Sequence, residues 1–118
     1  MIFLSGEFIE RTGRRERRHA SDLRIAEFLR GRVAEAKTVE EETLLGFVRR
    51  NRGLAARFGI TSEQGVARFC LVQVVYGGAA ERDPGVASYL MRPDGDPEED
   101  IRRLVDTLAR LSAPDGGA

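Results

Sequence analysis

Residues 61–78 read TSEQGVARFCLVQVVYGG, and this segment decides the fold of the chain. Thr61–Gln64 have the spacing of a capping box, which starts an α-helix. The run Val66–Tyr76 that follows is apolar nearly all round, and Gly77 with Gly78 stops it. A buried β-strand is the alternative for the valine-rich part, but helical signals continue through the whole segment. Because a helix without a polar face needs neighbours on every side, we predict a central helix within a bundle.

Two amphipathic helices are predicted before this segment. The first begins near Ser5 and is either one helix with a bend near Ser21, which we favour, or two helices split there. Its apolar residues recur at steps of three and four, and they are Leu23, Ala26, Leu29 and Val33. The second begins at a capping box in which Thr38 is the N-cap and Glu41 lies three residues on. Gly59 stands where a left-handed residue would end this helix. Its apolar stripe consists of Leu44, Phe47, Val48, Asn51, Leu54, Ala55 and Phe58.

Two Asp-Pro pairs predict the last two helices, because Pro is favoured at the first helical position after a cap. Asp83-Pro84 starts a short helix with Val86, Tyr89 and Leu90. Asp96-Pro97, reinforced by Glu99, starts a longer helix with the stripe Ile101, Leu104, Val105, Leu108 and Leu111. The sequence therefore predicts an all-α fold: a single domain at residues 1–111, built as a bundle of about five helices around a central apolar helix. Residues 112–118 are predicted to form a flexible C-terminal tail.

Composition excludes several classes of protein. The 118 residues include 19 basic and 19 acidic side chains, so the net charge of zero argues against a nucleic-acid coat protein. One Cys and one His exclude a disulfide framework, a cysteine-based zinc site and a two-histidine metal site. The longest apolar run is too short to span a membrane, and the N-terminus lacks the basic region of a signal peptide. We therefore expect a cytoplasmic protein without a membrane segment.

The zero net charge is the sum of two unlike halves. Residues 1–57 hold 13 basic and 9 acidic side chains, which gives +4. Residues 58–118 hold 6 basic and 10 acidic side chains, which gives −4. This division leaves room for an oriented, charged surface that docks a partner.

No catalytic set can be assembled from the residues present. His19 stands among arginines and is expected to be a partly exposed helix residue. Cys70 lies in the most apolar helix, where a small buried thiol is the ordinary outcome. The acidic stretch Asp94–Asp100 lacks the ligand rhythm of a calcium loop, and helix capping accounts for its acids. We therefore expect no enzyme activity, no metal ion and no cofactor.

Two stretches are candidate partner-binding surfaces. Arg11, Arg14, Arg15 and Arg18 recur at steps of three and four and would form one stripe on a helix. This stripe is either a solvated face, partly neutralised by Glu7 and Glu10, or a docking surface for an acidic partner or a phosphate backbone. The second candidate is the loop that contains Gly77, Gly78 and Glu81, for which a plain connection between helices is the alternative.

Residues 54–69 also allow a helix-turn-helix interpretation, in which Gln64 and Arg68 would contact DNA. The alanines, the turn glycine and the polar start of a second helix come in the order that a helix-turn-helix motif requires. However, Gly65 stands where an apolar residue of the second helix is expected, and the rest of that helix is too apolar for a DNA groove. A DNA-binding regulator is therefore the alternative hypothesis.

The residues Phe58–Glu63, Val66–Phe69, Gly77 and Asp83-Pro84 resemble, in this order, a group of small helical bacterial proteins. These proteins tend to be encoded beside type VI secretion or related toxin-effector genes. The resemblance covers about residues 44–91 and implies an accessory, adaptor or immunity-like partner of an effector. It implies no catalytic residues.

This chain departs from that group at two places. Residues 77–81 read GGAAE where the group tends to have Gly-Pro-Asp-aromatic-Asp, and Gly65 replaces a usual acid. Our leading hypothesis is a non-enzymatic protein-binding accessory (adaptor, chaperone or immunity-like partner) of a bacterial secretion or toxin-effector system. Its expected partner is a protein, such as the product of a neighbouring effector gene, and homo-oligomers are compatible with the sequence.

Overall fold

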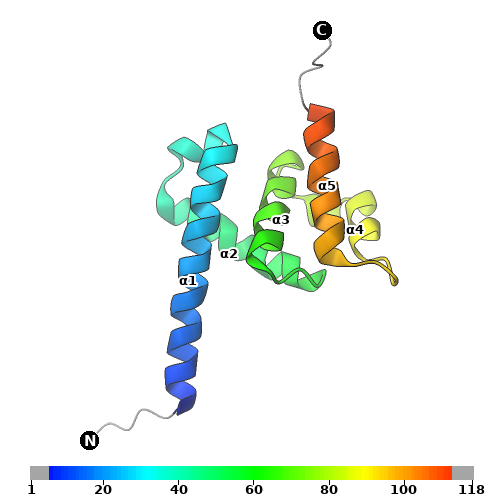
Figure 1. Ribbon diagram of the computed structural model, residues 1–118. Coiled ribbons are helices and arrows are strands. Elements are labelled where there is room, and N and C mark those ends of the chain that lie inside the picture. Colours follow the sequence, from blue (N-terminus) through cyan, green and yellow to red (C-terminus); the bar gives the residue numbers. More distant parts are fainter. Residues whose placement is uncertain (1–5, 113–118) are drawn as a thin grey trace, which may run out of the picture.

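The computed structural model describes the backbone of residues 6–112 and the side chains of residues 13–111. The elements are α1 (Gly6–Arg32), η1 (Ala34–Thr38), α2 (Glu41–Arg57), α3 (Glu63–Val75), η2 (Ala80–Arg82), α4 (Pro84–Leu90) and α5 (Pro97–Ser112), where η marks a short 3₁₀ helix (Figure 1). Residues 6–112 contain five α-helices and no β-strand, which confirms the predicted all-α bundle. Of the predicted tail, only Ser112 lies within the described residues, as the last residue of α5.

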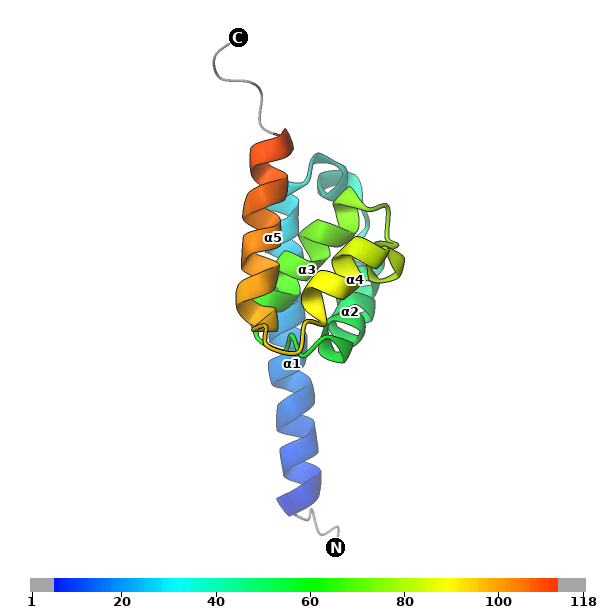
Figure 2. The same cartoon turned by 90° about the vertical axis from the view of Figure 1, so that its right-hand side faces the viewer.

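Helix α3 is the central helix, as predicted. It packs against α1, α2 and α5, and both views show it between them (Figures 1 and 2). Its fully buried residues include Val66, Phe69, Cys70 and Val72. At its C-terminus the Gly78 N–H donates to the Gln73 carbonyl (2.8 Å), which closes the last turn.

Helix α2 also ends at the predicted glycine. Gly59 has φ +82°, and the N–H groups of Gly59 and Ile60 donate to the carbonyls of Ala56 and Ala55 (both 3.0 Å). This pair of bonds is the Schellman motif, which needs a residue that tolerates positive φ. Ile60 is fully buried as a result, and the chain turns into α3.

The predicted N-terminus of α2 is wrong. Thr38 is the last residue of η1 and not an N-cap, and α2 begins at Glu41 after Glu40. The reason is tertiary: Arg30 of α1 donates to the carbonyl oxygens of Ala36 (2.7 Å) and Val39 (3.0 Å) and holds this connection as a short turn. The helix therefore starts three residues after Thr38.

Helix α1 is continuous from Gly6 to Arg32, as predicted, but its buried face differs from the prediction. The face that packs on the bundle contains Asp22, Ile25, Ala26 and Leu29, which are at most 4% exposed. Leu23 is 37% exposed because it lies one residue round the helix from this face. The N-terminal half of α1 projects beyond the other helices (Figure 2). The predicted cap Ser5 lies outside the described residues.

The two Asp-Pro helices form where predicted. Asp83 accepts from the N–H groups of Gly85 (2.9 Å) and Val86 (3.0 Å), and Asp96 accepts from the N–H of Glu98 (3.1 Å). Leu111, predicted on the apolar stripe of α5, is 78% exposed because α5 runs past the bundle there. Among the described helices, none is both long and apolar enough to cross a membrane.

The side chain of Glu98 joins the start of α3 to the start of α5. The Ser62 hydroxyl accepts from the Gly65 N–H (2.9 Å) and donates to Glu98 (2.7 Å). Glu98 also accepts from the N–H groups of Thr61 and Ser62 (both 3.0 Å). In a capping box the acid three residues after the cap would do this, but Gly65 occupies that position here. A carboxylate from another helix therefore completes the cap.

We expect Gly65→Ala to destabilise the protein by about 1–3 kcal/mol, because a methyl group there overpacks the contact. A Cβ at Gly65 would lie 2.1 Å from Glu98 Oε1 and 2.6 Å from Ile60 Cγ2. The control is Gly46→Ala in α2, whose added Cβ meets nothing within 4 Å, so it should be neutral or stabilising by up to about 1 kcal/mol. Urea denaturation measures the free energy of unfolding of both variants. Equal effects would contradict the close packing of Gly65 against Glu98 and Ile60.

Burial opposes ionisation of Glu98, but its hydrogen bonds from Ser62 and from the Thr61 and Ser62 N–H groups outweigh this and hold its pKa below 4.5. A lowered pKa in the folded state stabilises the protein above pH 4.5, and this stability is lost as the pH falls through the folded pKa. We therefore expect Glu98→Gln to destabilise the protein at about pH 7 and to have a much smaller effect at about pH 3. Denaturation at both pH values tests this, and a pH-independent difference would refute it.

A candidate basic cleft between α1 and α2

A cleft of about 660 Å³ lies between α1 and α2, with the turn before α3 at one end. Its charged residues are Arg15, Arg18, His19 and Asp22 from α1, and Arg49 and Arg52 from α2. Among the described lining residues four guanidinium groups face one carboxylate, which gives a net charge of +3 when the histidine is neutral. The remaining lining residues are Gly53, Ala56, Ile60 and Thr61.

The two arginines of α2 in the cleft are held in place by side chains of α1. Asp22 is 2% exposed and lies on the buried face of α1. Arg52 donates to Asp22 (3.0 Å) and to the Ser21 hydroxyl (2.7 Å), and Arg49 lies 3.6 Å from the other Asp22 oxygen. Arg49 also lies 3.3 Å from Nδ1 of His19. One buried carboxylate thus orients two guanidinium groups, whose remaining N–H donors stay free to bind an anion.

The arginines of α1 lack such anchors. Arg15 and Arg18 are exposed, and neither forms a hydrogen bond or an ion pair with another side chain of residues 13–111. Both lie on the wall opposite Arg49 and Arg52. The cleft therefore combines a fixed wall with a wall of long, adaptable cations, a combination that suits carboxylate or phosphate groups.

The predicted arginine stripe is divided by the structure. Arg15 and Arg18 line the cleft, whereas Arg14 interacts elsewhere within the chain. The side chain of Arg11 lies outside the described residues, as do those of Glu7 and Glu10. Sequence reasoning missed Arg49 and Arg52 because they fall outside the apolar stripe of α2. The available signal was Asp22, an acid at a position that continues the buried face of α1.

The second predicted surface is tied to the body of the protein. Gly77 and Gly78 have φ +63° and +85° and end α3. Glu81 accepts from the buried Gln73 amide (2.7 Å) and lies 3.6 Å from Arg50. Burial opposes ionisation of Glu81, but the Gln73 hydrogen bond and nearby arginines hold its pKa below the usual value. None of these loop residues lines the basic cleft.

The residues of the DNA-binding alternative lie on another side of the molecule. Gln64 is exposed and Arg68 is half-buried, and both line a groove formed by α1, α3 and α5. Most of the remaining surface of α3 is covered by its neighbours, although Val74 and Val75 near its C-terminus are exposed.

His19 and Cys70 differ sharply in their surroundings. His19 is exposed and belongs to the basic cleft. Cys70 is fully buried, and burial raises the pKa of its thiol to about 12. A thiol with this pKa is protonated at neutral pH and is a poor nucleophile. The described residues contain no cluster of three or more side chains that could hold a metal ion.

No protein-family model, no curated protein and no solved structure matches this chain.

We expect Asp22→Asn to destabilise the protein by about 1–3 kcal/mol, because it removes the buried negative charge that pairs with two arginines. Asp106→Asn is the matched control: it breaks an exposed ion pair with Arg102 and should cost no more than about 0.5 kcal/mol. Chemical denaturation of both variants measures the difference. A cost for Asp22→Asn as small as that of the control would show that Asp22 does not anchor the cleft.

Proposed function

We propose that this protein is a non-enzymatic binding module that docks an acidic segment of a partner protein in the basic cleft between α1 and α2. The observation that carries the proposal is the convergence of Arg15, Arg18, Arg49 and Arg52 on one cavity with Asp22 as its single carboxylate. We further propose that it acts in the cytoplasm as an adaptor, chaperone or immunity-like accessory of a bacterial secretion or toxin-effector system. This biological setting rests on the sequence resemblance alone.

Preorganisation supports carboxylate binding in the cleft. Asp22 and Ser21 already restrict Arg52, so Arg52 loses less conformational entropy when it binds an incoming acidic side chain. Guanidinium groups bind carboxylates through two parallel hydrogen bonds, which favours arginine over lysine in such sites. The net charge of +3 would also speed the encounter with an acidic surface at low ionic strength.

A protein partner is better supported than DNA. In the helix-turn-helix alternative the recognition helix is α3, which packs against α1, α2 and α5. Its N-terminus is further occupied by the Glu98 cap and by an ion pair between Glu63 and Arg24 (2.7 Å). Carboxylates at this position would repel a phosphate backbone. The DNA-binding alternative therefore serves as a competing outcome of the experiment below.

The test is co-purification with the product of the neighbouring effector gene. We expect Arg18→Glu to weaken binding about tenfold or more, because it reverses a charge inside the cleft. Arg17→Glu is the matched control, since Arg17 is an exposed arginine of the same helix that does not line the cleft. This control should bind nearly as the wild type does.

Two results would overturn the proposal. One is the absence of a retained partner, combined with equal behaviour of Arg18→Glu and Arg17→Glu. The other is tight retention on duplex DNA that falls steeply as salt rises, which would indicate phosphate contacts and favour the regulator.

A further inference from the structure

A second, partly apolar surface lies on the side of the bundle formed by α1, α3 and α5. It consists of two adjoining cavities of about 490 and 370 Å³. The cavities share Arg32, Leu71 and Val105, so together they form one continuous groove, which we call the α1–α5 groove. Helices α1 and α5 each pack on α3, which lies between them in Figure 1.

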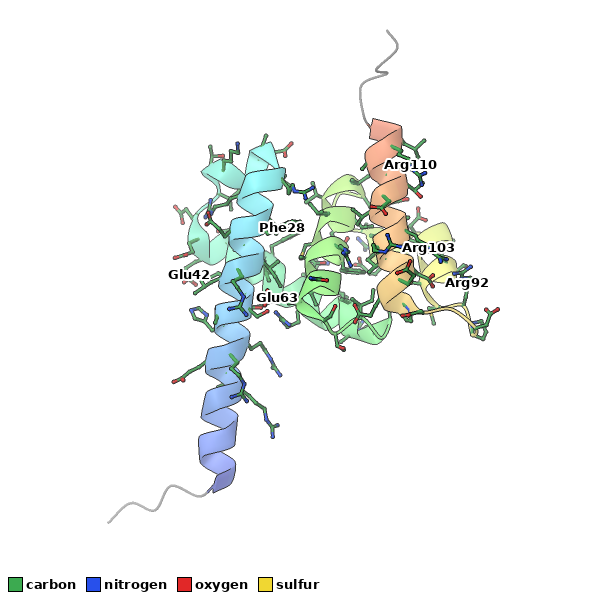
Figure 3. All side chains as sticks on the ribbon, viewed as in Figure 1. Phe28, Glu42, Glu63, Arg92, Arg103 and Arg110 are labelled. Carbon is green, nitrogen blue, oxygen red and sulfur yellow. The ribbon has the colours of Figure 1, made fainter. Side chains whose placement is uncertain are left out.

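The floor of the groove is apolar and incompletely covered. Its half-buried or exposed hydrophobic residues are Phe28, Val33, Leu71, Val74, Val75, Val105 and Leu108. Val74 and Val75 are 40% and 61% exposed, although they belong to the otherwise buried central helix. Figure 3 shows Phe28 and Glu63 between α1 and α3. Apolar side chains gathered in one groove favour a binding surface over scattered exposure.

The rim of the groove is basic. Arg24, Arg32, Arg68 and Arg102 line it together with the acids Glu35, Glu63 and Asp106, which gives a net charge of +1 among the described lining residues. Two of these arginines are neutralised, since Arg24 pairs with Glu63 (2.7 Å) and Arg102 with Asp106 (3.3 Å). Arg32 lies over the Phe28 ring (5.2 Å), and neither Arg32 nor Arg68 forms an ion pair among residues 13–111. The unneutralised charge at the rim is therefore positive.

We infer that the α1–α5 groove binds an amphipathic helix of a partner protein, with apolar residues on one face and acidic residues on its flanks. A helix fits the geometry because α1 and α5 form two walls and α3 forms the floor, as in helix-in-groove complexes. Helix α5 has 16 residues, so a partner helix of similar length would span about 24 Å along the groove.

Charge argues against a second copy of this chain as the occupant. The part of the chain that projects from the bundle is the N-terminal half of α1, and residues 6–19 hold five arginines and three glutamates, a net charge of +2 (Figure 2). This segment would place arginines beside Arg32 and Arg68 on the rim. Like charges at close range repel, so an acidic helix is the better match.

The inference does not depend on the basic cleft. The α1–α5 groove shares no lining residue with the cleft, so a substitution in one surface does not replace a lining residue of the other. Loss of binding in Arg18→Glu would therefore test the proposed function, and loss of binding in groove variants would test this inference.

The test uses the full-length chain and a synthetic acidic helical peptide of about 16 residues. The peptide carries leucines at i, i+3, i+4 and i+7 and glutamates on both flanks. We expect micromolar binding by fluorescence anisotropy, with nuclear magnetic resonance shifts at Phe28, Leu71 and Val105. The double variant Arg32→Glu/Arg68→Glu should weaken binding about tenfold or more. Val75→Asp should weaken it too, and this exposed position should tolerate the change without unfolding.

The matched control is Arg103→Glu/Arg110→Glu, which makes the same change in net charge at two exposed positions of α5 outside the groove (Figure 3). It should bind the peptide nearly as the wild type does. The inference is overturned if the peptide does not bind, if a lysine-flanked version binds equally well, or if the shifts cluster in the basic cleft. Dimerisation of the free chain through Val75 would also overturn it.

Discussion

The carboxylate of Glu98 is the contact on which the relation between α3 and α5 depends. It receives three hydrogen bonds from the residues that start α3, and Gly65 leaves the space that it fills. The carboxylate satisfies N–H groups that have no partner within α3, and it thereby ties the start of α3 to α5. Thr61, one of the donors, also lines the basic cleft, and α3 with α5 forms two sides of the α1–α5 groove. Both candidate surfaces thus share one structural support.

The two surfaces use arginine in different ways. In the cleft, buried Asp22 fixes Arg52 from within the protein, so the guanidinium is oriented before any partner arrives. In the groove, Arg24 and Arg102 are neutralised by acids at the surface, and Arg32 lies over the Phe28 ring. Of the 19 basic residues only Lys37 is a lysine. Arginine is less strongly hydrated than lysine and binds carboxylates bidentately, so this composition favours both surfaces.

Local signals made much of the fold predictable. Gly59 and the Asp-Pro pairs act within a few residues of themselves, and the structure places each of these caps as expected. The capping box predicted at Thr61–Gln64 is wrong by one residue, since Ser62 is the N-cap of α3. The prediction of Thr38 as an N-cap was wrong because Arg30, eight residues earlier, donates hydrogen bonds to backbone carbonyls of this connection and holds it in another conformation. The helical spacing indicated Arg15 and Arg18, but their meeting with Arg49 and Arg52 depends on how α1 packs on α2. Glu98 could not be assigned to Ser62 for the same reason, since the two lie 36 residues apart in the chain.

The lone thiol of Cys70 makes the opening of the core measurable as a rate. Because the side chain is fully buried in the central helix, a reagent reaches it only when the bundle opens around α3. When opening and closing are fast, the observed labelling rate is the intrinsic rate multiplied by the fraction of open molecules. A ligand that binds only the closed bundle lowers that fraction by mass action. Binding of a partner at any surface of the native bundle should therefore lower the rate at which the single cysteine is labelled.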